Sequence, residues 1–149
     1  MKKFQFKFDK VLILKEQEKE ETVYHFQDSV RQFEKTAEKL YNALKKKEDL
    51  ETYQSNQLVN GFPVQEVRHY QMFITNLEKS IVFYQDQVIK ARNKMKWLEQ
   101  KVTEKNIEVK QYEKMKENDY KVFTINQQKQ ENKVLDELSV MKYVNREIR

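Results

Sequence analysis

Glycine and proline are almost absent from this sequence of 149 residues, since each occurs only once. Average usage would give roughly ten glycines and seven prolines in a chain of this length. A globular domain needs several turns, and turns depend on residues that adopt positive φ or have φ already fixed. With 36% charged and 38% hydrophobic residues, the composition predicts a single domain over residues 1–149, built from long helices that bury a narrow seam.

Cysteine is absent as well, which excludes disulfide bonds, thiolate metal sites and a cysteine nucleophile. Long hydrophobic runs are also missing. The longest purely apolar run covers residues 11–14, far short of the roughly 20 residues that a membrane-spanning helix needs. Lys2 and Lys3 resemble the start of a signal peptide, but further charges follow too closely for a hydrophobic region. We therefore expect no direct membrane insertion.

Catalytic and ligand-binding motifs are missing too. His25 and His69 are far apart in the sequence, and none of the serines has a nearby histidine–acid pair. A single glycine cannot form a phosphate-binding loop. The carboxylates are spread over faces that we expect to be solvated, without a concave pocket to shift a pKa. We expect no enzyme activity, no cofactor and no bound metal.

The only glycine and the only proline occur together, in the Asn-Gly-Phe-Pro segment at residues 60–63. Gly61 suits the left-handed position that ends a helix, and Pro63 suits the first turn of the next helix. The segment predicts one helix over about residues 8–59, a loop over 60–63 and a second helix over about 63–140. A loop this short makes the two helices antiparallel neighbours.

Hydrophobic residues recur at alternating steps of three and four, the heptad pattern of a coiled coil. In the second half of the chain, thirteen of fourteen consecutive seam positions are apolar or aromatic. Those fourteen positions are Val67, Tyr70, Ile74, Leu77, Ile81, Tyr84, Val88, Ala91, Met95, Leu98, Val102, Lys105, Val109 and Tyr112. The first half gives a weaker seam through Val23, Phe26, Val30, Phe33, Ala37, Leu40, Leu44 and Leu58. The predicted fold is all-α: an antiparallel two-helix coiled-coil hairpin.

Folding the chain at Gly61 brings residues whose numbers sum to about 124–125 opposite each other, as for Leu44 and Ile81. The second seam fails near residue 116, where the first helix runs out. Residues 116–149 are therefore expected to form an overhanging C-terminal helix without a partner in this chain. Exposed apolar residues at helical spacing on such an extension are typical of a binding surface.

The N-terminal segment differs from both seams. Phe4, Phe6 and Phe8 alternate with polar residues, and residues 11–14 are apolar all round. This segment is too apolar for a solvated helix surface. It either folds onto the second helix or anchors the chain in another protein.

The net charge of +5 raises the possibility of nucleic-acid binding. The densest basic stretch, residues 90–101, directs its charges several ways around a helix and forms no single stripe. Acidic and basic residues alternate along most of the rest, which favours a solvated surface with many ion pairs. A nucleic-acid-binding coiled coil and a generic structural homodimer remain the alternatives to a hairpin that binds proteins.

Four blocks of sequence together resemble the FliJ family of flagellar export proteins in its Gram-positive form. Their order and spacing extend over nearly the whole chain. The blocks are Phe4-x-Phe6-x-Phe8 with its continuation to Glu20, Asn60-Gly61, Tyr70-Gln71-x-Phe73-Ile74-x-x-Leu77-Glu78-x-x-Ile81, and Thr103 to Lys110.

The resemblance implies a component of the flagellar type III export apparatus that is not an enzyme. Family members are hairpins similar to the central stalk of a rotary ATP synthase, and they link the hexameric export ATPase to the membrane export gate. The implied partners are this ATPase, the cytoplasmic part of the gate and the export chaperones, without nucleic acid. The implied state is a cytoplasmic monomer, peripheral at the membrane face of the flagellar base.

The resemblance also assigns candidate contact residues. Phe73, Leu77 and Tyr84 match the region that contacts the export gate. By analogy with a stalk, the end that carries both termini would contact the ATPase. The residues expected there are Phe4, Phe6, Phe8, Leu12, Phe123, Val134 and Leu138.

Overall fold

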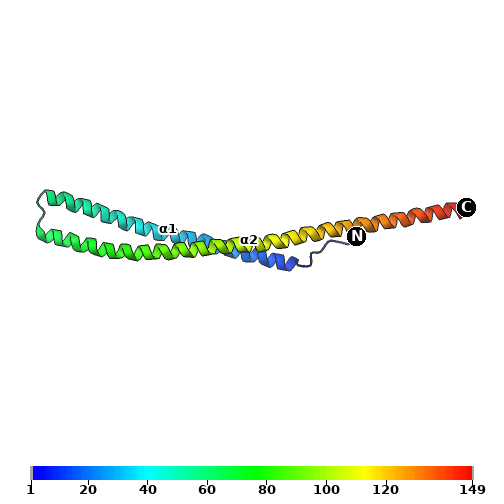
Figure 1. Ribbon diagram of the computed structural model, residues 1–149, viewed down its shortest axis with the longest axis horizontal. Coiled ribbons are helices and arrows are strands. Elements are labelled where there is room, and N and C mark those ends of the chain that lie inside the picture. Colours follow the sequence, from blue (N-terminus) through cyan, green and yellow to red (C-terminus); the bar gives the residue numbers. More distant parts are fainter. Residues whose placement is uncertain (1, 149) are drawn as a thin grey trace. The chain divides into compact units, whose positions relative to one another are not determined.

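The structure, a computed structural model, describes residues 2–148 and contains two helices (Figure 1). Helix α1 spans Asp9–Val59 and helix α2 spans Val64–Ile148. No strand occurs among the residues that the structure describes. The predicted all-α helical hairpin is confirmed, although α2 continues eight residues beyond the predicted end near residue 140.

The chain divides into two compact units, each of which contains part of both helices. Unit 1 comprises Met1–Lys19 and Glu104–Arg149, and unit 2 comprises Glu20–Thr103. Backbone hydrogen bonds form the helical segments of each unit. Side chains at the seam between those segments form the core of each unit.

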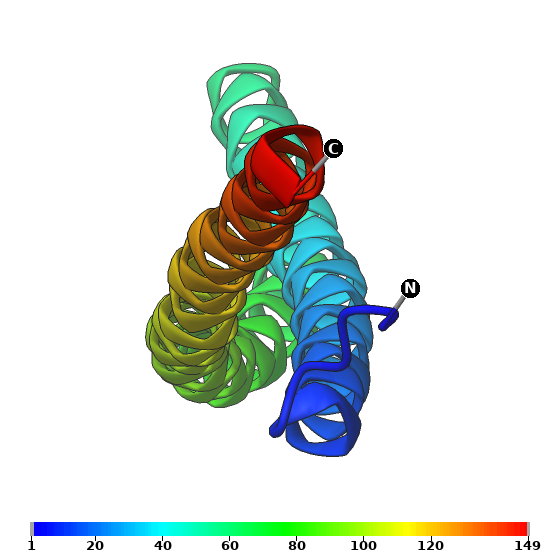
Figure 2. The same ribbon diagram turned by 90° about the vertical axis from the view of Figure 1, so that its right-hand side faces the viewer.

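The turn of unit 2 forms where the sequence predicts it. Gly61 has φ of 86°, in the left-handed region that glycine adopts without a steric penalty. Val67 N–H donates a hydrogen bond to the Pro63 carbonyl at 3.0 Å, which satisfies one free donor in the first turn of α2. Within this unit α1 and α2 run antiparallel and lie side by side in both views (Figures 1 and 2).

An aromatic cluster closes unit 2 beside this turn. The ring centroids of Tyr53 and Tyr70 lie 5.3 Å apart, and those of Phe62 and Tyr70 lie 5.5 Å apart. Burial, together with a hydrogen bond to Tyr53, raises the pKa of Tyr70 above its usual value. Three aromatic rings therefore pack together at the end of the hairpin, beside the turn.

The α2 side of the seam follows the predicted heptads. All fourteen predicted seam positions are buried or half-buried. The most buried of the apolar ones are Ile74, Ile81, Leu98 and Val109. Hydrophobic burial along this stripe is the main favourable contribution to folding in a two-helix structure.

The α1 side of the seam consists of two series of positions, each repeating every seven residues, and one of the two series differs from the prediction. Leu44 and Leu58 are exposed, whereas Ser29 and Ala43 are buried, so the prediction that the two leucines face α2 is wrong. Small side chains fit where two helices approach closely. The Ser29 hydroxyl donates to the Phe26 carbonyl at 2.6 Å, so its burial leaves no unsatisfied donor.

Ion pairs between the helices fix the alignment within two residues of the predicted register. In unit 2, Lys47 Nζ lies 3.4 Å from a carboxylate oxygen of Glu78. In unit 1, Lys116 Nζ donates to Asp9 Oδ1 at 3.3 Å. Both pairs join residues whose numbers add to 125, as folding at Gly61 requires.

The N-terminal segment of unit 1 folds onto α2 without forming a helix. The core of this unit contains Phe6, Leu12 and Val109, with Phe4, Phe8 and Tyr112 packed against it. Asp9 N–H donates to the Phe6 carbonyl at 3.2 Å, where α1 begins. Of the two alternatives that the sequence left open, the structure shows packing on the second helix.

The overhang begins later than predicted. Gln127 Nε2 donates to the Lys2 carbonyl at 3.2 Å, and Phe4 packs on Tyr120 and Phe123. The segment without a partner in the described chain therefore starts after residue 127 and not at residue 116. An extended chain advances about 3.3 Å per residue against 1.5 Å in a helix, so a few N-terminal residues cover four turns of α2.

Neither helix, within the described part of the chain, contains a stretch long and apolar enough to cross a membrane.

Candidate protein-binding surfaces

The aromatic side chains of the N-terminal segment pack mainly on α2 of the same chain. Phe6 and Leu12 are only 7% and 5% exposed, so the prediction that these two side chains contact a partner does not fit the folded unit. Phe8 is half-buried and packs edge-on against Tyr112, with ring centroids 6.3 Å apart. The aromatic residues of this segment stabilise unit 1, whereas Ile13 and Leu14 at the start of α1 remain 48% and 52% exposed.

Two further predicted residues of this group pack against each other. Phe4 and Phe123 are both half-buried, with ring centroids 5.5 Å apart. Phe4 also contacts Tyr120 edge-on at 5.3 Å. These aromatic contacts hold the N-terminal segment on α2 and leave only part of each ring accessible to another protein.

The end of α2 is different, because all side chains described from residue 128 onward are exposed. Val134 and Leu138, both predicted to contact a partner, are 54% and 51% exposed. They follow Phe123 and Gln127 along one face of the helix, since i, i+3 and i+4 positions share a face. The other large apolar side chains exposed in this segment, on various faces of the helix, are Leu135, Val140, Met141, Tyr143 and Val144.

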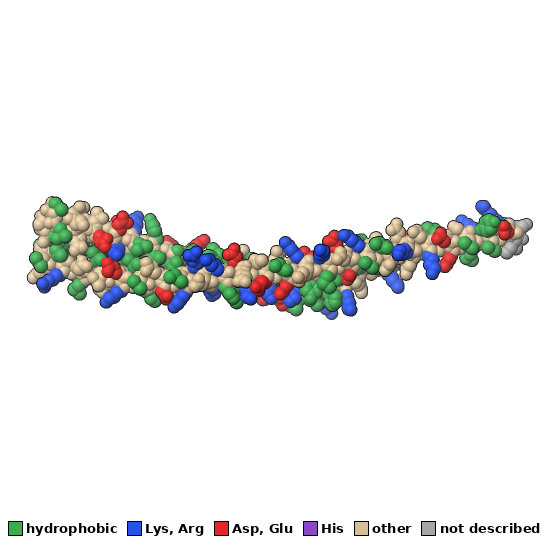
Figure 3. Space-filling view, viewed as in Figure 1, with side chains coloured by type: hydrophobic (Ala, Val, Ile, Leu, Met, Phe, Trp, Pro, Cys, Tyr) green, Lys and Arg blue, Asp and Glu red, His purple; other side chains and the backbone are tan. Residues whose placement is uncertain are grey.

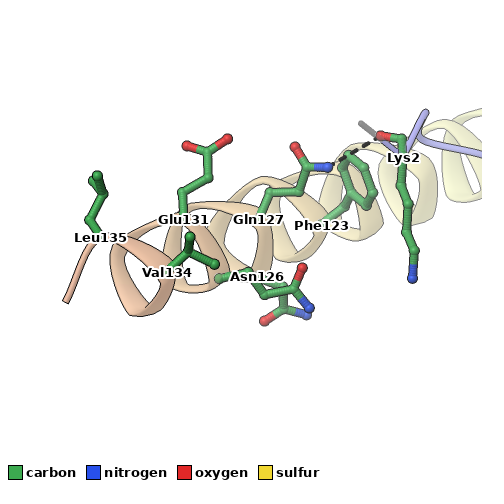
Figure 4. Close-up of a pocket in the computed structure, with 8 residues that line it drawn as sticks. Lys2, Phe123, Asn126, Gln127, Glu131, Val134 and Leu135 are labelled. Carbon is green, nitrogen blue, oxygen red and sulfur yellow. Dashed lines mark hydrogen bonds between the residues drawn. The ribbon is translucent and has the colours of Figure 1, made fainter. Parts of the chain in front are cut away.

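A shallow groove of about 740 Å³ marks where the N-terminal segment ends on α2 (Figure 4). Lys2 and Phe123 line one end, and Val134 and Leu135 line the other. Figure 4 shows the hydrogen bond from the Gln127 amide to the Lys2 main chain between them. An accessible apolar surface therefore starts directly where the internal packing stops.

The three residues predicted to contact the gate lie on α2 of unit 2 but differ in exposure. Phe73 is 43% exposed, and Lys46 Nζ lies 5.1 Å from its ring centroid. Leu77 and Tyr84 are seam positions and are half-buried. Phe73 is therefore the member of this group with most surface available for a partner.

Sequence reasoning missed several apolar residues on the outer face of α2 in unit 2. Met72 and Phe83 are 67% and 58% exposed, and they lie on nearly the same side of the helix because eleven residues make about three turns. Both fall outside the heptad seam. A hydrophobic residue at an outward heptad position is the signal that would have identified them.

The charged surface mixes both signs, as Figure 3 shows on one face. In the basic stretch, Lys90 pairs with Asp86 at 3.0 Å, and Lys101 Nζ lies 5.4 Å from the Trp97 ring centroid. Exposed pairs of this kind contribute little to stability.

A denser charge cluster lies between the helices of unit 1. Lys105 Nζ donates to Glu18 Oε2 at 3.3 Å, and Lys15 Nζ approaches the same oxygen at 3.6 Å. Glu108 Oε2 lies 3.4 Å from Lys15 Nζ and 3.8 Å from Lys105 Nζ. The four side chains thus form a closed ring of alternating charge.

The cluster shifts the pKa of two of its members. The close approach of the Glu108 carboxylate, and then of Glu18, raises the pKa of Lys15 above 10.5. The hydrogen bond from Lys105 lowers the pKa of Glu18 below 4.5. Both shifts favour the charged forms, as expected for opposite charges held together.

Among the described residues, no group of three or more histidine and acidic side chains is placed to hold a metal ion. The described residues form a helical seam and a ring of paired charges, and each unit exposes large apolar side chains, among them Phe73 in unit 2 and Val134 and Leu138 in unit 1. This arrangement defines a class: an all-α two-helix hairpin with apolar side chains exposed in each unit.

Comparison with known proteins gives the family. The sequence matches the family described as "Flagellar FliJ protein" over residues 4–147. It is also 45% identical, over 141 residues, to the Flagellar FliJ protein of Bacillus subtilis (strain 168), with 95% of this chain and 96% of that protein covered. No solved structure matches. The chain belongs to the FliJ family, and its role is in flagellar protein export.

Proposed function

We propose that this chain is a non-catalytic adaptor of the flagellar type III export apparatus, linking the hexameric export ATPase to the membrane export gate. In this role it also aids delivery of chaperone-escorted substrates during flagellum assembly. It acts as a monomer in the cytoplasm, peripheral at the membrane face of the flagellar base. The observation that supports this proposal best is that each of the two units has its own exposed apolar surface.

The surface of unit 1 is the proposed ATPase contact. Val134 and Leu138 lie one turn apart on a helix without a partner in the described chain, and both are half-exposed or more. An amphipathic helix with such anchors at i and i+4 is suited to a groove in a partner protein. The same face, through Phe123, continues into the packed part of the unit.

The surface of unit 2 is the proposed gate contact. Phe73 presents an accessible ring that Lys46 covers on one side. Aromatic side chains with partly accessible rings are common anchors at protein interfaces. Tyr84 and Leu77 would contribute through their accessible edges only, because both also form the seam.

Co-purification with tagged chain tests the two contacts separately. The double variant Val134→Ser with Leu138→Ser should lose most capture of the export ATPase and keep capture of the gate's cytoplasmic domain. Its matched control is Asn132→Ser with Asp136→Ser, two exposed positions on the opposite face of the same helix. Wild-type chain that captures neither protein would refute the proposal.

A further inference from the structure

The charge ring of unit 1 occupies the seam between the helices. Lys105 is the one charged residue among the fourteen seam positions of α2. The side chains of Lys15 and Lys105 are 26% and 32% exposed, and those of Glu18 and Glu108 are 33% and 38% exposed. The Glu108 Oε2 atom itself is inaccessible to solvent.

We propose that Lys15, Glu18, Lys105 and Glu108 form a register lock that selects one heptad alignment of α1 on α2. A partly buried polar layer in the seam stabilises a coiled coil less than an apolar layer would, but it discriminates between alignments. The proposal concerns the fold itself and does not depend on which partners the chain binds.

Every one-heptad slip breaks both contacts between the helices, Lys105–Glu18 and Lys15–Glu108, and keeps the one contact within each helix. In one direction Lys105 would face Val11 and Glu108 would face Phe8. In the other direction Lys105 would face His25. Glu108 would then face the neutral Thr22. In both slips Lys105 and Glu108 lose the opposite charge on α1 and keep only each other, which makes the slipped alignments less stable than the native one.

The seam of unit 2 discriminates less, although the Lys47–Glu78 ion pair joins its helices. On α1 it repeats small residues every seven positions, through Thr22, Ser29, Thr36 and Ala43. On α2 it repeats Ile74, Ile81, Val88, Met95 and Val102 at the same interval. A one-heptad slip would pair similar side chains in these two rows, and it would move the turn about one helical turn away from Gly61.

The alignment decides how much of α2 stays free. In the native register the N-terminal segment reaches Gln127. A slip of seven residues displaces one helix along the other by about 10 Å, and in one direction it would carry this segment to Val134. The lock therefore keeps the apolar surface of the unpaired segment uncovered.

Thiol cross-linking can measure the register directly, because the chain contains no cysteine. Lys47→Cys with Glu78→Cys reports the native alignment, since these side chains meet across the seam at 3.4 Å. Lys47→Cys with Gln71→Cys, or with Gln85→Cys, reports the two one-heptad slips. The cross-linker must be shorter than the roughly 10 Å rise of one heptad.

Three backgrounds separate the lock from general stability. One replaces all four charged residues with leucine. A second exchanges all four charges, as Lys15→Glu, Glu18→Lys, Lys105→Glu and Glu108→Lys. The control replaces an exposed ion pair, as Asp86→Leu with Lys90→Leu. Circular dichroism establishes that each variant is helical before the cross-links are compared.

We expect the ratio of slipped to native cross-links to rise at least about tenfold in the leucine variant, which corresponds to about 1.4 kcal/mol. The charge-exchanged variant should return to the wild-type ratio, and the control should never leave it. A helical leucine variant with the wild-type ratio would overturn the proposal. A charge-exchanged variant that slips as much as the leucine variant would overturn it as well.

Discussion

The two units have cores of opposite character. Unit 2 packs an apolar stripe of α2, with Ile74, Ile81 and Leu98 buried, against small side chains of α1 such as Ser29 and Ala43. Unit 1 combines the aromatic N-terminal segment, the Leu12–Val109 contact and a ring of four charges. A periodic apolar seam supplies stability along the helices, whereas irregular aromatic and charged contacts specify a single alignment.

A charge placed in the apolar seam of unit 2 should cause the largest loss of stability and so tests the difference between the two cores most directly. Ile81 is 6% exposed, so Ile81→Asp removes a buried aliphatic side chain and desolvates a carboxylate. We expect unfolding free energy to fall by about 4 kcal/mol or more, measured by urea denaturation followed by circular dichroism. The adjacent Val82, 64% exposed, provides the control Val82→Asp, which should change stability by less than about 0.5 kcal/mol. Equal losses would contradict the assigned seam.

Val88→Asp extends the same test to a half-buried seam position. Its loss of stability should be smaller than that of Ile81→Asp, because part of the new carboxylate stays hydrated. Lys94→Asp, at an exposed position on the same helix, should have almost no effect. A larger loss for Lys94→Asp than for Val88→Asp would place the seam on the wrong face.

A second variant should affect unit 1 alone. Phe6 is 7% exposed and packs with Leu12 and Val109, so Phe6→Ala should cost about 3 kcal/mol of local stability. Hydrogen exchange should then show lost protection over residues 9–19 and 104–127. The exposed Gln5 offers the control Gln5→Ala, which should leave protection unchanged. Loss of protection throughout unit 2 would show that the two cores are not independent.

The heptads of α2 were predictable because its seam residues are large and apolar, so their period is visible in the sequence. One row of the α1 seam was not predictable in the same way. Ser29 and Thr36 bond their hydroxyls to carbonyls of their own helix, Phe26 and Gln32, and small or hydroxyl residues leave no hydrophobic signal. Leu44, one position further on than Ala43, gave the stronger but wrong signal.

The candidate surfaces were predicted less completely than the fold. The exposed apolar face at Val134 and Leu138 could be predicted, because the heptad pattern of apolar residues in the second helix stops near residue 116. The start of the overhang did not, because the sequence does not show that residues 2–8 are extended and reach Gln127. Phe6 and Leu12 were assigned to a partner for the same reason: an apolar segment looks alike whether its partner is internal or external.

Titration of the charge ring should give a smaller effect than either core variant. The pKa of Glu18 is lowered by Lys105, so the stability it contributes is present above pH 4.5 and is lost as pH falls through its folded value. The pKa of Lys15 is raised, so its contribution is present below pH 10.5 and is lost above it. The hydrogen-exchange protection of unit 1, or the melting temperature, should therefore fall below about pH 4.5 more steeply in wild type than in Glu18→Gln. Identical acid profiles would mean that Glu18 is not linked to folding.

The smallest expected effect on folding comes from Phe73, which nevertheless tests the function of unit 2. Phe73→Ala removes a side chain that is already 43% exposed and one contact with Lys46, so it should lower stability by about 1 kcal/mol or less. If the ring is a binding anchor, affinity for the gate's cytoplasmic domain should fall about tenfold or more. Isothermal calorimetry would measure this change beside circular dichroism, with the exposed Lys79→Ala as control. A large loss of helicity together with unchanged affinity would identify Phe73 as part of the core and would remove it from the interface.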